Sequence, residues 1–137
     1  MLDYLKLYAG TLVVFLAVDL LWIGVIARGF YKEQLAPYLT DNPVWSAAFA
    51  FYFLFVAGLI YFVVAPGLRE SSSLSVVASG AFFGLIAYAT YDLTNQATVK
   101  DWPALLTIVD MAWGTFLSAV VSFTSFQLGQ WLAIGAE

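Results

Sequence analysis

Four long apolar stretches, separated by short polar segments, make up most of the chain. A helix rises about 1.5 Å per residue, so roughly 20 apolar residues cross a hydrocarbon core of about 30 Å. We therefore predict four membrane-spanning helices, over about residues 4–27, 44–65, 74–97 and 104–132. Short connections place consecutive helices side by side and antiparallel. The pattern predicts an all-α, polytopic integral membrane protein in which a single transmembrane domain, residues 1–137, forms an antiparallel four-helix bundle.

The polar segments between the spans differ in length and character. Residues 28–43 form the longest and mix charged residues, aromatic residues and two prolines, which is typical of an interfacial segment at the lipid headgroups. We expect this segment to be the lid of any site in the bundle. Pro66 and Gly67 are expected to end the second span. That span carries no charge and many aromatic residues, so we expect it to pack outside any polar site.

Composition strengthens the membrane interpretation and excludes other classes. Of 137 residues, 63% are hydrophobic and 10% are charged, and the mean hydropathy of +0.89 is too high for a soluble core of this size. A net charge of -4 without any basic run argues against a nucleic-acid partner. The chain has no cysteine and no histidine, which removes disulfides, thiolate chemistry and imidazole ligation. We therefore expect no cofactor. Carboxylates alone can bind a hard cation, but the sequence shows no ligand spacing for one, so we expect no metal either.

Three aspartates interrupt the apolar stretches, namely Asp19, Asp92 and Asp110 in the first, third and fourth spans. On scales derived from translocon insertion, an aspartate at mid-membrane is unfavourable by about 2.5–3.5 kcal/mol. Each of the three must therefore face the bundle interior, find a partner or serve a function. Counted from the adjacent loops, each lies about 12–14 Å inside the same face of the membrane. We therefore expect the three carboxyl groups to converge on one layer.

The residues around these acids share an aromatic or amide character and fall on the same helical faces. Tryptophan follows two of the acids after three residues, and tyrosines and an asparagine flank the third. This pattern predicts an intramembrane pocket. Its predicted lining is Asp19, Trp22, Tyr88, Tyr91, Asp92, Asn95, Asp110 and Trp113.

Small residues on the third and fourth spans predict that these two helices pack closely. Gly80 and Gly84 form a GxxxG pattern, which permits close approach of helices in a membrane. Gly114 and Ser118 supply small side chains on the fourth span. We expect these residues to serve helix packing.

Several runs of sequence carry a family resemblance. They are VDLLWIG at residues 18–24, RGFY at 28–31, AYATYDLTNQAT at 87–98, Trp-Pro at 102–103 and VDMAWG at 109–114. Together they resemble the domain-of-unknown-function family 2177 of small bacterial membrane proteins, over nearly the whole chain. The resemblance implies four membrane helices in a bacterial inner membrane and no established activity.

The leading functional hypothesis is a binding or transport protein. Its pocket would accept a small amphipathic or cationic ligand, with proton coupling through the acids. A single four-helix chain is small for alternating access, so the transport version expects a homodimer. The partners expected are the lipid bilayer and a small amphipathic or lipid ligand, and no nucleic acid.

Two alternatives remain open. The first is a membrane enzyme, or an accessory subunit of lipid modification, in which Asp19, Asp92 or Asp110 acts as general acid or base. The sequence offers no nucleophile arrangement, redox motif or phosphate loop, so an enzyme ranks second. The second alternative is a structural membrane partner whose acids and tryptophans only hold helices together.

Overall fold

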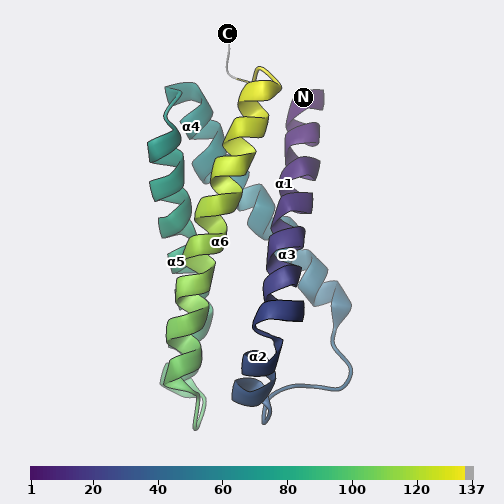
Figure 1. The fold of residues 1–137 in the computed structure, drawn as a ribbon, viewed down its shortest axis with the longest axis vertical. Coiled ribbons are helices and arrows are strands. Elements are labelled where there is room, and N and C mark those ends of the chain that lie inside the picture. Colours follow the sequence, from purple (N-terminus) through teal and green to yellow (C-terminus); the bar gives the residue numbers. More distant parts are fainter. Residues whose placement is uncertain (135–137) are drawn as a thin grey trace.

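The computed structural model describes residues 1–134, which are helical apart from short turns and a longer loop over residues 36–44. Within that range, four helical segments are long and apolar enough to cross a membrane: Leu2–Ile26, Trp45–Glu70, Ser73–Thr98 and Ala104–Trp131. The first, third and fourth run roughly along one common axis, and the first begins at the end of the bundle where the last one ends (Figure 1). The described part of the chain contains no strand. The predicted all-α, polytopic membrane fold is therefore confirmed.

The first span ends in a wide turn that redirects the chain. Helix α1 (Leu2–Leu21) continues into a π-helical turn, η1 (Trp22–Ile26), in which the amide of Ala27 donates to the carbonyl of Trp22 at 2.7 Å. Helix α2 (Arg28–Leu35) starts directly afterwards and lies across the lower end of the bundle (Figure 1). π-Helical turns are often found at functional sites. Here the turn lets α2 fold back beneath the bundle.

The second span is longer than the sequence pattern suggested. Helix α3 (Trp45–Leu59) continues through a second π-helical turn, η2 (Ile60–Val64), into α4 (Ala65–Glu70). Pro66 lies in the first turn of α4, where its missing amide hydrogen costs little. The expected stop at Pro66 and Gly67 was therefore wrong. The helix ends at Ser71, whose φ of 53° is left-handed.

Helices α5 (Ser73–Thr98) and α6 (Ala104–Trp131) pack closely against each other around Gly80 and Gly84. A Cβ atom placed on Gly80 would meet the side chain of Ser122, and one placed on Gly84 would meet Ser118 and the carbonyl of Gly114. Such close contact between small residues is a main source of helix association in lipid. The two helices form a tightly packed hairpin.

The helices are not packed equally along their length. Helix α3 packs against α1, whereas η2, further along the same span, packs against α5 and α6. In Figure 1 α3 accordingly lies obliquely behind the other helices. A buried core of Phe15, Phe55, Leu59, Leu117 and Val121 fills the bundle where the helices meet. The half of the bundle nearer α2 has room for a cavity.

Candidate functional site

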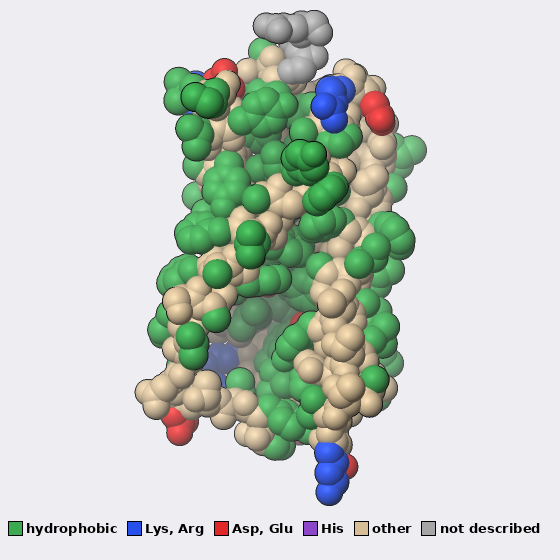
Figure 2. Space-filling model, turned by 180° about the vertical axis from the view of Figure 1, so that it is seen from behind, with side chains coloured by type: hydrophobic (Ala, Val, Ile, Leu, Met, Phe, Trp, Pro, Cys, Tyr) green, Lys and Arg blue, Asp and Glu red, His purple; other side chains and the backbone are tan. Residues whose placement is uncertain are grey.

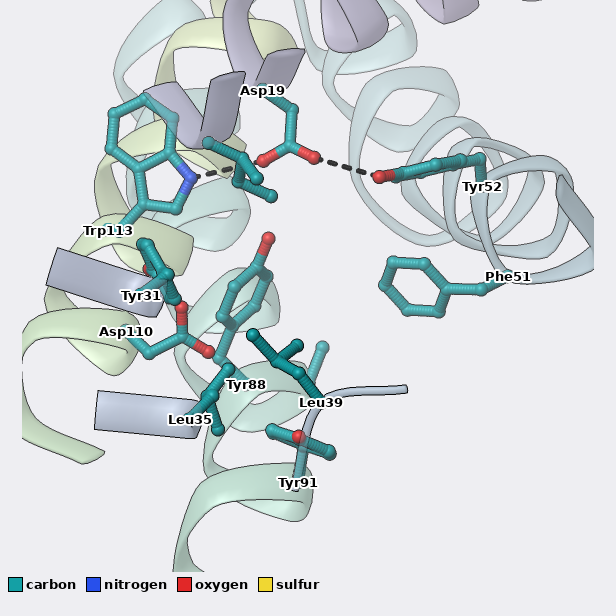
Figure 3. Close-up of a pocket in the computed structure, with 12 residues that line it drawn as sticks. Asp19, Tyr31, Leu35, Leu39, Phe51, Tyr52, Tyr88, Tyr91, Asp110 and Trp113 are labelled. Carbon is teal, nitrogen blue, oxygen red and sulfur yellow. Dashed lines mark hydrogen bonds between the residues drawn. The ribbon is translucent and has the colours of Figure 1, made fainter. Parts of the chain in front are cut away.

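A cavity of about 500 Å³ lies in the half of the bundle nearer α2. Figure 2 shows the molecule hollowed below the oblique second span, and Figure 3 shows the lining side chains. Every long helix contributes to the walls, which combine apolar side chains with two carboxyl groups and four tyrosines. The lining is Asp19, Ile23, Tyr31, Leu35, Leu39, Phe51, Tyr52, Ala87, Tyr88, Tyr91, Asp110 and Trp113.

Asp19 is held by two hydrogen-bond donors from different helices. Its carboxyl group accepts a bond from the indole Nε1 of Trp113 on α6 and another from the hydroxyl of Tyr52 on α3, each at 3.2 Å (Figure 3). Only 2% of Asp19 is exposed. Because both of its oxygens have a donor, this buried carboxyl group is well solvated by the protein.

Asp110 is held by a chain of donors that begins on η1. The Tyr31 hydroxyl donates to Asp110, and the indole Nε1 of Trp22 donates to the Tyr31 oxygen at 3.2 Å. Burial, together with the bond to Asp110, raises the pKa of Tyr31 above its ordinary value. Tyr31 therefore keeps its proton and stays a donor. Asp110 is only partly buried and reaches the cavity wall.

The two aspartate-tryptophan pairs cross between helices. Asp19 on α1 binds Trp113 of α6, while Trp22 on η1 reaches Asp110 of α6 through Tyr31. The two indole rings stack with centroids 4.3 Å apart and planes 7° apart. These hydrogen bonds and the stacked indole rings join α1, η1, α2 and α6 in one cluster.

Asp92 differs from the other two acids. It is fully buried on α5, next to the carboxyl group of Asp110, and does not line the cavity. Neither of its oxygens has a hydrogen-bond partner among the described residues. A buried polar group without a partner is uncommon and needs an explanation.

Within residues 1–134 no group of three or more acids is arranged to hold a metal ion.

The structure brings together five of the eight residues expected to line a pocket: Asp19, Tyr88, Tyr91, Asp110 and Trp113. Trp22 lies behind the wall, stacked on Trp113. Asp92 lies behind Asp110, and Asn95 is half-buried one turn further along α5, away from the lining. Fewer polar residues of α5 therefore line the cavity than expected.

The sequence did not identify two tyrosines of the site, Tyr31 and Tyr52. Tyr31 belongs to the RGFY run, but nothing in its spacing places its hydroxyl on Asp110. Tyr52 lies on the second span, which was expected to pack outside the site, and that expectation was wrong because Phe51 and Tyr52 both line the cavity. The second span has aromatic residues on every face, so its pattern does not mark the one that faces inward.

The last residue of α2 and the segment after it contribute to the cavity lining. Leu35 and Leu39 line the cavity there. Between them, the Tyr38 hydroxyl donates to the carbonyl of Lys100 at 2.6 Å, and the Tyr38 ring lies 5.5 Å from that of Trp102. These contacts tie the segment to the loop between α5 and α6. That it acts as a lid stays a prediction.

Comparison with known proteins agrees with this architecture. No curated protein and no solved structure matches the chain. A family model described as "Predicted membrane protein (DUF2177)" matches residues 4–127, which include all of the cavity lining. The chain therefore belongs to the DUF2177 family and is a multi-pass membrane protein.

Proposed function

We propose that this protein, in a bacterial inner membrane, binds or transports a small amphipathic ligand with a cationic head. The observation that carries the proposal is the cavity itself, in which Asp19 and Asp110 are set among apolar and aromatic walls within the membrane. A pocket with mostly apolar walls and a few polar groups is the usual form of a small-molecule site. Intramembrane acids mark such sites by default.

The charge of the lining favours a cation. Two of the lining residues are acids, and none of them is a lysine or arginine. Trp113, Tyr52 and Tyr88 present aromatic rings beside the acids. Aromatic faces attract cations, and the attraction reaches about 2 kcal/mol or more when the cation is desolvated. A ligand cation would therefore supply the positive charge that the site lacks.

The position of the cavity favours an amphipathic ligand. Phe51 on α3, Tyr91 on α5 and Leu39 in the lid are each about half exposed while lining the cavity. Helices α3 and α5 are parts of membrane spans, so an opening between them, beside Phe51 and Tyr91, would face lipid. An apolar chain can leave the cavity through this gap and remain in hydrocarbon, while the cationic head stays beside the acids.

Photolabelling tests the proposal directly. The probe is decyltrimethylammonium with a diazirine in its chain, and its control is decanol with the same diazirine, both added to the purified protein in lipid nanodiscs. We expect saturable labelling of the cavity residues by the cation and only weak labelling by the alcohol. Asp110→Asn should weaken the labelling about tenfold, equivalent to about 1.4 kcal/mol. Asp101→Asn, in an exposed loop, should leave it unchanged.

Equal labelling by cation and alcohol, unaffected by Asp110→Asn, would contradict the proposal. The transport version also needs a homodimer, since one chain of this size cannot easily alternate its access. Native mass spectrometry of the nanodiscs measures this: a dimer mass supports transport, and a monomer that still binds the cation supports binding alone.

A further inference from the structure

The three intramembrane acids differ in how many hydrogen-bond donors they have. Asp19 receives two, from Trp113 and Tyr52. Asp110 receives one, from Tyr31. Asp92 receives none among the described residues, although it is completely buried. An ionised carboxylate without donors cannot be accommodated in a buried site at reasonable cost, so Asp92 must be neutral or hold a cation.

Among the described residues, the ionisable groups around Asp92 include no base that could neutralise it. The ionisable groups facing this region come from five helices, and all of them are acids or tyrosines. Asp110 of α6 and Tyr91 of α5 lie next to Asp92. Around Tyr88, one turn away on α5, lie Asp19 of α1, Tyr31 of α2 and Tyr52 of α3. A proton is therefore the simplest neutralising species.

The position of Asp110 shows where that proton would point. A protonated carboxyl group becomes a donor, and an ionised one is purely an acceptor. Asp110 lies next to Asp92, and the Tyr31 hydroxyl occupies one of its oxygens. A proton on Asp92 would give Asp110 its second donor and give Asp92 its first partner. One proton thus completes the hydrogen bonding of both groups.

We propose that Asp92 and Asp110 hold one proton between them, carried by Asp92 and donated to Asp110, and that a cation entering the cavity beside Asp110 displaces it. The second half rests on the proposed function. In the exchange, the O–H bond of Asp92 breaks and the proton passes to water, while the arriving cation lies close enough to the adjacent carboxylates of Asp110 and Asp92 to balance the charge that the proton leaves behind. The exchange leaves the net charge of the carboxyl groups and their counterion unchanged, so it adds no uncompensated charge to a medium of low dielectric constant.

Exchange of one proton for one cation fixes the pH dependence of binding. Protons compete with the cation, so the affinity for decyltrimethylammonium should rise as pH rises. The slope should be about tenfold per pH unit while one proton is displaced. This probe keeps its charge at every pH, so the slope reports the protein alone.

Infrared spectroscopy of the ligand-free protein in lipid tests the proton directly. At neutral pH we expect the carbonyl stretching band of one buried, protonated carboxylic acid. Labelling aspartate with ¹³C in the unaltered protein should shift this band. The band should vanish in Asp92→Asn, whose side-chain amide can still donate to Asp110, and persist in Asp19→Asn and Asp101→Asn. Absence of the band from the unaltered protein, or its persistence in Asp92→Asn, would overturn the proposal.

A proton-release measurement then tests the exchange. Adding decyltrimethylammonium to weakly buffered nanodiscs should release about one proton per bound cation, reported by a pH dye, and none from Asp92→Asn. Binding without release overturns the exchange and leaves the proposed function intact. An infrared band that depends on Asp92, with no cation binding at any pH, supports the proton pair and overturns the proposed function.

Discussion

The two halves of the α5–α6 hairpin differ in what they place against the rest of the bundle. In the half that contains Gly80, Gly84, Ser118 and Ser122, the helices touch along small residues and leave no space. In the half that contains Tyr88, Tyr91 and Asp110, larger side chains surround a cavity of about 500 Å³. We infer that the first half of the hairpin stabilises the bundle, whereas the second half is less tightly packed and forms the site.

The largest effect should come from filling the packed half. Gly84→Leu would drive a side chain into the carbonyl of Gly114 and into Ser118, so α5 and α6 would have to separate. We expect loss of folded, monodisperse protein, measured by size-exclusion chromatography in detergent. Gly24→Leu is the matched control, because a Cβ there meets nothing within 4 Å. Equal behaviour of the two variants would show that the packed half does not determine stability.

Substitutions of Asp19 and Asp110 should affect different properties. The change at Asp19 should mainly lower stability, and the change at Asp110 should mainly weaken cation binding. Asp19→Asn replaces one of two acceptors by an amide that faces a donor, so it should lower the free energy of unfolding by about 1–3 kcal/mol. Asp110→Asn keeps an oxygen for Tyr31, so it should change stability less and cation labelling more. Thermal unfolding and photolabelling of both variants measure this. Identical profiles for the two variants would contradict distinct roles.

A smaller effect is expected from Tyr52→Phe. This change removes one of the two donors to Asp19 and keeps the ring that lines the cavity. The free energy of unfolding should fall by about 1 kcal/mol, the usual net value of one hydrogen bond. Tyr61→Phe is the control, because Tyr61 is 71% exposed on the same span. Should both variants unfold at the same temperature, the Tyr52 bond adds nothing measurable.

The smallest effect should come from Tyr38→Phe in the lid. The change removes the hydroxyl that donates to Lys100 and keeps the ring beside Trp102. We expect unaltered stability and faster release of decyltrimethylammonium, measured by chasing the bound probe with an excess of unlabelled cation. An unchanged release rate would mean that this bond does not hold the lid.

The fold could be predicted from the sequence because the physical demand is simple. Each span must be long and apolar, and the four stretches meet that demand without ambiguity. The error at Pro66 arose because proline and glycine usually end a helix, whereas here a π-helical turn precedes a proline in a first helical turn. Helix ends depend on such local geometry, which the hydrophobic pattern does not record.

The site was harder to predict than the fold. The cost of burying a charge marked Asp19, Asp92 and Asp110, since such residues must be turned inward. The same reasoning could not identify Tyr31 or Tyr52, because tyrosine is tolerated in many membrane positions. Their roles depend on how α2 folds back and which way α3 turns, and both are properties of the whole bundle.

The central claim is that the cavity receives a cationic head beside Asp110 while an apolar chain occupies the gap between α3 and α5. The most direct measurement is a crystal structure with decyltrimethylammonium brominated at the end of its chain. The account predicts anomalous bromine density near Phe51 and Tyr91, with the cationic head against Asp110. Bromine density confined to the outer, lipid-facing surface, with the cavity holding no part of the probe, would contradict it.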